Sequence, residues 1–242
     1  MDGLIVGDCL PTLQAMDGGS VDLIFADPPF NIGYRYDLHN DRQKREEYLG
    51  WSHQWLRECV RLLRRTGSLF VAISDESCAE LKLMLDQFGL SFRNWIIWKY
   101  TFGRHQERRF GRDHTHILYY TAHPDRFIFN AEDIRIESER QRLGDRRANP
   151  AGRVPGDVWE GPRLTGNNRE RTGHPCQMPE SILERIIRAA SNVGDLVFDP
   201  FAGSGTTLAV AKRLGRRWLG CEISPAYAAA ATQRIGKVRP EV

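Results

Sequence analysis

The alternation of short apolar runs with amphipathic segments limits the fold of this chain more than any other feature. Short runs rich in β-branched and aromatic residues predict strands, and they cover residues 4–6, 21–26, 68–73, 95–100, 116–121, 196–201 and 216–224. Longer segments that repeat apolar residues every three or four positions predict helices, at residues 46–63, 76–88, 181–190, 206–215 and 225–235. This alternation predicts an α/β fold with βαβ units and a mainly parallel sheet.

The periodicity fails between residues 101 and 173, where arginine, glycine, asparagine and proline are frequent. A loop-rich insert of this size inside a compact protein is usually either functional or disordered. Acidic residues are interleaved with the arginines, so a plain solvated surface is the alternative interpretation. We therefore expect three parts: one half of a domain over 1–121, an insert over 122–173 that acts with the loop 101–115, and the other half over 174–242.

Composition excludes several classes of protein. No apolar run approaches the roughly 18 residues that span a bilayer, and the first residues lack the basic flank and apolar stretch of a signal peptide, so we expect no membrane association and a cytoplasmic location. The five cysteines are scattered without a CxxC pair, which favours free thiols in a reducing compartment and argues against a metal site. The formal net charge of +3 is too small to indicate a nucleic-acid partner by itself. The distribution of the charge matters more.

The first motif that carries chemistry is Asp27-Pro28-Pro29-Phe30, which directly follows the strand predicted over 21–26. That strand is apolar almost throughout, as expected of a strand buried on both faces of a parallel sheet. In open α/β sheets ligands bind at the carboxyl ends of the strands, so an acid held there by two prolines is placed to contact one. The alternative interpretation is a proline-rich turn with a solvated aspartate.

The second motif is the run LVFDPFAGSGTT over 196–207, in which a strand passes through a glycine-rich turn into a helix. Gly203 and Gly205 permit positive φ and a close approach of the backbone to a ligand. The next strand ends in Glu222, about 20 residues further on, where an acid can hold the hydroxyls of a ribose. The turn does not read GxGxxG and nothing matches GxxxxGK[ST], which argues against a dinucleotide oxidoreductase and a P-loop NTPase.

Together the two motifs resemble those of the amino-group DNA methyltransferases, which modify adenine N6 or cytosine N4. The resemblance covers nearly the whole chain. It implies a Rossmann-like S-adenosylmethionine methyltransferase fold, with a mainly parallel sheet and an antiparallel edge strand. The catalytic motif precedes the cofactor motif, with a variable segment between them. This order is similar to that of the circularly permuted β group, in which the variable insert is the target-recognition region.

The resemblance also assigns the cofactor site. Asp8, after the first strand, is similar to the acid of a short Gly-Asp motif near the cofactor's adenine, although a helix cap is the commoner role for such an aspartate. Residues 174–179, His-Pro-Cys-Gln-Met-Pro, resemble a His-Pro-Thr-Gln-Lys-Pro motif at the cofactor's methionine end; Cys176 and Met178 depart from it by losing a hydroxyl and a cation. The cofactor-binding residues implied are Asp8, Cys9, Asp27, His174, Gln177, Pro179, Asp199, Phe201, Ala202, Gly203, Ser204, Gly205, Thr206, Thr207 and Glu222.

The resemblance implies that Asp27, Pro28, Pro29 and Phe30 are catalytic. The carboxylate of Asp27 and the carbonyl of Pro28 would each accept an N–H from the target amine, while the prolines fix the turn. Phe30 would stack on a base that has been flipped out of the duplex. An aspartate at the first position favours adenine N6 as the target, with cytosine N4 as the alternative.

Double-stranded DNA is the partner that the resemblance implies. A homodimer and a cognate restriction endonuclease acting on the same site are left open. An RNA substrate has little support because no RNA-binding module is attached, and a non-catalytic DNA-binding regulator with the same fold is the alternative from another class. Arginine contacts phosphates and reads guanine, so the predicted DNA contacts are Arg104, Arg108, Arg109, Arg112, Arg146 and Arg147.

Overall fold

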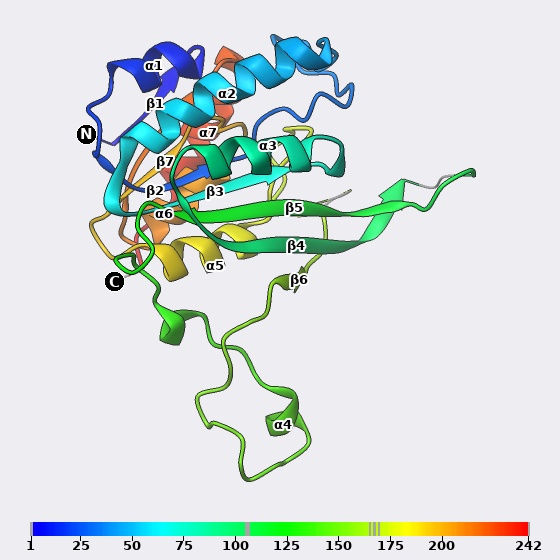
Figure 1. Ribbon diagram of the computed structural model, residues 1–242, viewed down its shortest axis with the longest axis vertical. Helices are drawn as coiled ribbons and strands as arrows, with labels where there is room; N and C mark the ends of the chain where they lie inside the picture. The colour runs from blue at the N-terminus through cyan, green and yellow to red at the C-terminus, as the bar shows by residue number, and fades with distance from the viewer. Residues whose placement is uncertain (1, 105–106, 165, 167, 169, 242) are drawn as a thin grey trace.

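The computed structural model describes residues 2–104, 107–164, 166, 168 and 170–241. Within these residues, eight strands form one sheet in the order β1-β8-β7-β2-β3-β5-β4-β6 (Figure 1). The neighbouring pairs are parallel except those that involve β5, so the predicted mainly parallel α/β sheet is confirmed. The strands are β1 Gly3–Val6, β2 Val21–Ala26, β3 Leu63–Ile73, β4 Ser91–Arg104, β5 Arg112–Thr121, β6 Val158–Glu160, β7 Leu196–Asp199 and β8 Arg217–Glu222.

The antiparallel strand was expected at an edge of the sheet, and this placement is wrong. β4 and β5 form a long hairpin, and β5 returns between β4 and β3, pairing Ser68 with Thr121 at one end and Ile73 with His116 at the other. The edge beyond β4 is instead taken by β6, which pairs with it in parallel. The hairpin strands also extend into the segment 101–115 that was expected to be a loop, because β4 continues to Arg104 and β5 begins at Arg112.

Helices cover both faces of the sheet. α1 Cys9–Ala15, α2 Arg45–Leu62 and α3 Asp75–Gln87 lie on one face, and α5 Glu180–Ala190 and α6 Thr206–Arg213 lie on the other (Figure 1). α7 Pro225–Lys237 packs on α6 and β1, and Ser224 caps its first turn. None of the helices in the described part of the chain is long and apolar enough to cross a membrane.

The sheet separates two apolar layers that hold the fold together. All six residues of β2 are buried, as expected for a strand covered on both faces. One layer joins the sheet to α2 through side chains such as Trp55 and Leu56, and the other joins it to α5 through Ile186 and Ile187. Trp159 of β6 belongs to the second layer and is only 8% exposed, so its side chain packs in the core.

The insert is ordered in its described part, although the sequence left disorder open. Most of it forms a lobe that projects from the body (Figure 1), with the short helices η1 Ala131–Ile134 and α4 Glu139–Arg142. Ile136 and Arg153 close the lobe by exchanging two backbone hydrogen bonds, each 2.9 Å long. Ser138 and Gln141 form a capping box at the start of α4. Local backbone pairing and capping therefore order a segment that has almost no apolar core.

Candidate active site

The carboxyl ends of β1, β2, β3, β7 and β8 open into one cavity of about 720 Å³. Cavities of this size commonly hold cofactors and small substrates. Most of the residues predicted from the two motifs lie in its wall. They are Asp8, Cys9, Asp27, Pro28, Pro29, Phe30, His174, Gln177, Asp199, Phe201, Ala202, Gly203, Ser204, Thr206, Thr207 and Glu222.

Asp27 follows the last residue of β2 and lies half-buried beside the end of β7. Burial, and after it the negative charge of Asp199, raises the pKa of Asp27 to about 8. Burial also raises the pKa of Asp199 to about 7, although its hydrogen bonds with Thr207 and Phe201 act in the opposite direction. Two acids whose ionisation is disfavoured by burial will bind a cationic ligand favourably, because such a ligand stabilises their charged forms.

The glycine-rich turn has the predicted backbone conformation. Gly203 and Gly205 have φ values of +50° and +70°, and residues that carry a side chain rarely adopt this region. A Cβ at Gly205 would also lie 2.8 Å from the Cβ of Ala231 in α7. Gly205 therefore serves the close packing of this turn against α7; it does not line the cavity itself.

Glu222 ends β8 and is 8% exposed. Its two carboxylate oxygens accept hydrogen bonds from the backbone N–H groups of Gly203 and Ser224, each 2.8 Å long. Burial raises its pKa, and these hydrogen bonds oppose the shift. Glu222 therefore holds the glycine-rich turn in shape, a role that the sequence did not predict, and it still presents its carboxylate to the cavity wall.

Asp8 combines the two roles that were weighed for it. It is the N-cap of α1, accepting a hydrogen bond of 2.9 Å from the backbone N–H of Leu10, and it also lines the cavity. α1 itself was not predicted, because it has only seven residues and contains Pro11. Proline is tolerated in the first turn of a helix, where its missing N–H needs no partner.

Residues 174–178 line the cavity together with Asp27. The ring of His174 lies 3.1 Å from the position that a Cβ would take at Gly203, and its centroid is 4.7 Å from that of Tyr227. Burial lowers the pKa of His174 to about 4, so the ring is neutral at physiological pH. Gln177 accepts a hydrogen bond from the backbone N–H of Thr172 and donates one to the carbonyl of Glu170. Gln177 thus ties this segment to the end of the insert.

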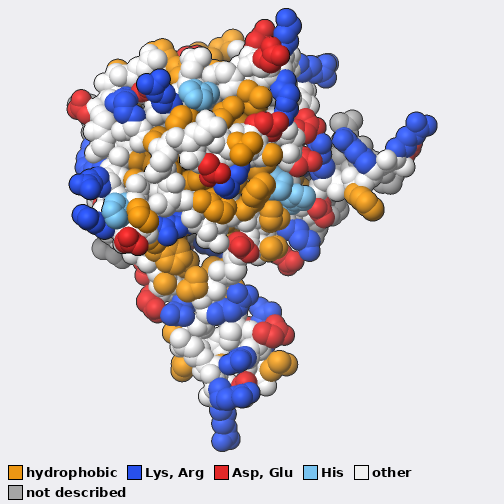
Figure 2. All heavy atoms as spheres, in the orientation of Figure 1, with side chains coloured by type: hydrophobic (Ala, Val, Ile, Leu, Met, Phe, Trp, Pro, Cys, Tyr) orange, Lys and Arg blue, Asp and Glu red, His pale blue; other side chains and the backbone are white. Residues whose placement is uncertain are grey.

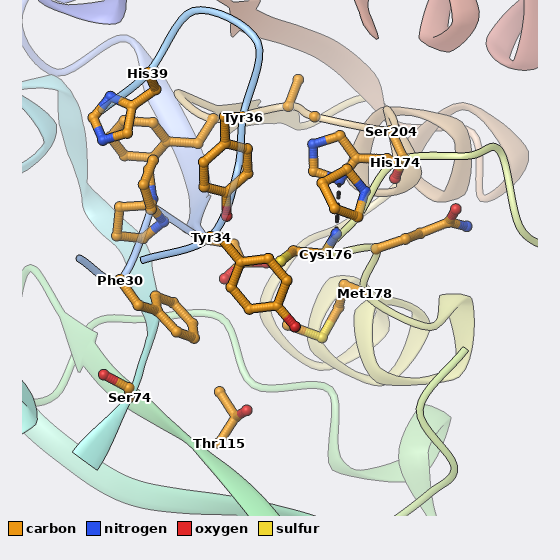
Figure 3. A pocket seen from close by; sticks show the side chains of 18 of the residues that line it. Phe30, Tyr34, Tyr36, His39, Ser74, Thr115, His174, Cys176, Met178 and Ser204 are labelled. Atoms are coloured by element: carbon orange, nitrogen blue, oxygen red, sulfur yellow. Dashed lines mark hydrogen bonds between the residues drawn. The ribbon is translucent and has the colours of Figure 1, made fainter. Parts of the chain in front are cut away.

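An aromatic wall, which the sequence analysis missed, completes the cavity. Tyr34, Tyr36 and His39 come from the loop after Phe30, and Figure 3 shows Tyr34 and Tyr36 between Phe30 and His174, with His39 on the far side of Tyr36 from His174. The ring centroids of Tyr34 and Tyr36 are 6.3 Å apart, and that of Tyr36 is 6.3 Å from that of His174. Further lining side chains come from α2, β3, β4, β5 and the end of the insert, namely Trp51, Ser74, Trp98, Tyr100, Thr115 and Arg163.

The local sequence contains one feature from which part of this aromatic wall could have been predicted. Tyr34 and Tyr36 stand four and six residues after Phe30, and aromatic residues so close to a ligand-binding turn are candidates for the same site. The contributions of Trp51, Tyr100 and Arg163 depend on long-range packing, so the local sequence carried no signal for them.

The predicted arginines divide between the cavity and more distant surfaces. Arg109 and Arg112 line the cavity. Arg112 is bound to Asp75 at 3.0 Å and to Glu76 at 2.7 Å, so its charge is already compensated. Arg108 is exposed near the hairpin tip, and the side chain of Arg104 lies outside the described residues. Arg146 and Arg147 are exposed in the projecting lobe, and Pro179, away from the cavity, precedes α5 as its N-cap.

Among the described residues, no three His, Cys, Asp or Glu side chains gather closely enough to hold a metal ion. The wall of the cavity offers carboxylates, backbone groups, aromatic rings, hydroxyls, thiols and guanidinium groups.

A mainly parallel α/β sheet, whose glycine-rich turn and acid-proline turn open into one cavity, is typical of proteins that bind a nucleotide cofactor. The model of the DNA methylase family of N6 and N4 methyltransferases matches residues 21–233, and the chain belongs to this family.

Comparison with individual proteins agrees with this membership. The chain is 37% identical over 233 residues to the Type II methyltransferase M.HpaI of Haemophilus parainfluenzae, covering 96% of this chain and 73% of that protein. It is 36% identical over 241 residues to the DNA adenine methyltransferase YhdJ of Escherichia coli (strain K12), covering 96% and 82%. The solved structure of TTHA0409 from Thermus thermophilus, complexed with S-adenosyl-L-methionine, gives a TM-score of 0.69 at 26% identity, covering 98% of this chain and 94% of that one.

Proposed function

We propose that this protein is a site-specific DNA methyltransferase that transfers a methyl group from S-adenosylmethionine to the N6 amine of a flipped adenine in duplex DNA. The observation that carries the proposal is that the turn 27–30 and the glycine-rich turn 199–205 open into the same cavity. The family membership and the similarity to an adenine methyltransferase support it.

The donors and acceptors of the cavity fit S-adenosylmethionine. Asp27 and Asp199, with pKa values raised to about 8 and about 7, suit a ligand that carries a sulfonium cation. Asp8 and Glu222, at the ends of β1 and β8, offer carboxylates to the adenosine part. The proposed binding set is the one predicted from the sequence without Pro179 and Gly205, which do not line the cavity. When bound there, the cofactor supplies an electrophilic methyl group.

The turn 27–30 would prepare the target amine. The lone pair of an exocyclic amine is delocalised into the base, so the amine is a poor nucleophile. Asp27 and the carbonyl of Pro28 can each accept one N–H, which favours a tetrahedral nitrogen and stabilises the positive charge that develops on it. Phe30 offers a stacking surface worth roughly 1–3 kcal/mol to the flipped base. The hydroxyl of Tyr48 donates a hydrogen bond of 3.0 Å to the carbonyl of Pro29, which further fixes the turn.

We further propose that the chain has the permuted motif order of the β group, since the catalytic turn precedes the cofactor turn by about 170 residues. In this assignment 1–121 is the catalytic half, 122–173 with the loop 101–115 recognises the target, and 174–242 is the cofactor half. The proposal also includes a homodimer and a partner restriction endonuclease that acts on the same site. A cytoplasmic location, which the five free cysteines support, is part of it as well.

Two alternatives compete with adenine methylation. The family includes N4 methyltransferases, so cytosine N4 is the other target that the same geometry can serve. A non-catalytic DNA-binding regulator is the second alternative. The acids at 27 and 199 argue against it, because holding two carboxyl groups close together at a site that disfavours their ionisation destabilises a fold that does not use them.

The test is mass spectrometry of nucleosides from DNA incubated with the protein and S-adenosylmethionine. N6-methyladenine that is absent with Asp27→Ala, and present with the control Asp17→Ala at an exposed acid, would establish the proposed reaction. N4-methylcytosine would keep the mechanism and change the base. If neither base is methylated while DNA and cofactor still bind, the regulator becomes the better assignment.

A further inference from the structure

The segment 31–43, here called the roof segment, follows Phe30 and contacts all three parts of the chain around the cavity. Tyr34 receives a hydrogen bond of 3.5 Å from Arg163 at the end of the insert. Asp37 accepts a hydrogen bond from the hydroxyl of Ser224, just after β8. The ring of Tyr36 lies beside that of His174, with the centroids 6.3 Å apart (Figure 3). The conformation of the roof segment therefore decides the shape of the cavity above the turn 27–30.

Asp41 is the centre of this segment. It is only 2% exposed, and its carboxylate accepts hydrogen bonds from three backbone N–H groups of the same segment. These come from Asn31 at 2.7 Å, Ile32 at 3.2 Å and Tyr34 at 2.7 Å. The carbonyl of Asp41 accepts a fourth, from the N–H of Gly33, at 2.8 Å. Successive backbone N–H groups that converge in this way form an anion-binding concavity, and here the anion belongs to the chain itself.

Asn31 closes the base of the segment. Its φ of +58° is the only positive value of a non-glycine residue in the described part of the chain. Its side chain accepts a hydrogen bond of 2.7 Å from the N–H of Gln43 and donates one of 3.0 Å to the carbonyl of the same residue. A strained residue persists only where its surroundings determine it strongly. The hydrogen bonds of Asp41 and Asn31 together hold this backbone conformation in place, immediately next to Phe30.

We propose that Asp41 is a positioning residue for methyl transfer, which fixes the roof segment so that Phe30, Tyr34 and Tyr36 surround the place of the flipped base. The proposal rests on the proposed function, because it assigns the aromatic wall to the base. Asp41 itself does not line the cavity, so it acts through the backbone of residues 31–34.

The chemistry requires a carboxylate at this position. An asparagine has the same shape, but one of its two oxygens is replaced by an NH₂ donor, which would face N–H groups that also need an acceptor. Backbone N–H groups left unpaired in a partly buried loop favour a different loop conformation. Asp41→Asn should therefore release the roof segment while leaving the sheet intact.

The first experiment measures the loop directly by limited trypsin digestion. Arg35, Arg42 and Lys44 are exposed cleavage sites in or next to the roof segment. Cleavage at these sites should be at least tenfold faster in Asp41→Asn than in the unsubstituted protein. Glu47→Gln is the matched control, because it removes a negative charge from an exposed position of α2 nearby, and it should leave the cleavage rate unchanged.

The second experiment distinguishes a lower turnover rate per intact protein molecule from a smaller amount of folded protein. The stoichiometry of S-adenosylhomocysteine binding counts the intact cofactor sites, and kcat for DNA methylation is expressed per site. Asp41→Asn should lower this kcat at least tenfold, with the KM for S-adenosylmethionine within threefold. If Asp41 acts through the aromatic wall, Asp41→Asn combined with Tyr36→Ala should lose no more activity than the worse single variant.

Asn31→Gly is the second variant in case Asp41→Asn folds poorly. Glycine keeps the positive φ but removes the contacts with Gln43. The cleavage rate should therefore rise and kcat should fall, as in Asp41→Asn, but by smaller factors. An unchanged cleavage rate and an unchanged kcat per site in Asp41→Asn would overturn the proposal. It would also be overturned if the free-energy losses of Asp41→Asn and Tyr36→Ala were additive in the double variant. If the unsubstituted protein methylates no DNA, the proposed function fails, while the trypsin experiment still decides whether Asp41 holds the segment.

Discussion

At the scale of single residues, the pair Asp27 and Asp199 makes cofactor binding depend on pH. The pKa values of these acids are raised to about 8 and about 7, so they are largely protonated at pH 6 and ionised at pH 9. A sulfonium cation binds more strongly beside ionised carboxylates. S-adenosylhomocysteine lacks this charge but shares the remaining contacts. The ratio of the two affinities therefore isolates the effect of the acids.

We expect the preference for S-adenosylmethionine over S-adenosylhomocysteine to rise by about tenfold between pH 6 and pH 9, since one pKa unit of coupling corresponds to about 1.4 kcal/mol. Isothermal titration calorimetry at several pH values measures both affinities. In Asp27→Asn the rise should be much smaller, because only Asp199 then titrates. A ratio that is independent of pH would show that these carboxylates do not face the sulfonium.

The residues that could be predicted from the sequence are those whose signal is local. Asp27, Phe30 and Glu222 stand at or just after the end of an apolar strand, and Gly203 stands between a strand and a helix, so their place in the cavity wall followed from their neighbours in the chain. Tyr100 and Arg163 reach the same cavity from β4 and from the end of the insert. Their place depends on how the hairpin and the insert fold back, which no local pattern encodes.

At the scale of elements, the packing of the glycine-rich turn on α7 connects cofactor binding with stability. An alanine at Gly205 would combine a φ of +70° with a Cβ that lies 2.8 Å from that of Ala231. We expect Gly205→Ala to destabilise the protein by about 1–3 kcal/mol and to weaken S-adenosylhomocysteine binding more than tenfold. Denaturant unfolding and calorimetry measure the two effects.

The clash and the backbone strain at Gly205 can be separated. Ala231→Gly in the Gly205→Ala background removes the contact but not the positive φ, so it should restore part of the lost binding. If binding does not recover at all, the strain alone is responsible. Full recovery would mean that the backbone conformation at this position has little effect.

The projecting lobe is an element that can be removed cleanly. Ile136 and Arg153 exchange two backbone hydrogen bonds, which is the pairing that flanks a two-residue hairpin turn. Replacing residues 137–152 by Asn-Gly should therefore leave the thermal midpoint within a few degrees and the affinity for S-adenosylhomocysteine unchanged. If the lobe recognises the target, kcat/KM for DNA should fall at least tenfold. Unchanged DNA kinetics would remove the lobe from the target-recognition region.

The strand and helix pattern was predictable because each run carried its own periodicity, whereas the order of the strands was not. A hairpin that folds back beside β3 and one that extends to the edge of the sheet have the same apolar pattern in β4 and β5. The choice depends on how β6 and the insert cover the far side of β4. Similarly, the lobe is ordered by backbone pairs and a capping box, which leave no apolar repeat in the sequence.

At the scale of the whole molecule, the small net charge of +3 conceals an uneven distribution. Figure 2 shows Lys and Arg side chains at the far end of the lobe and at the tip of the β4–β5 hairpin, both of which project from the body. Arg147 is 82% exposed in its side chain, and its ion pair with Asp145 is a surface pair of little energetic weight. The two projections therefore can both contact DNA phosphates.

This arrangement predicts the salt dependence of DNA binding. Each phosphate contact that is lost makes the negative slope of log K against log salt concentration shallower by about 0.9. Arg108→Ala, Arg146→Ala and Arg147→Ala together should therefore make it shallower by up to about 2.7. Arg65→Ala is the control, because Arg65 is exposed near the start of β3, away from the carboxyl edge where the cavity lies. Fluorescence anisotropy with duplex DNA between about 50 and 200 mM salt measures the slopes. Equal slopes for the triple variant and the control would place the DNA on another surface, because loss of contacts on the projections must reduce counterion release whatever the recognised sequence.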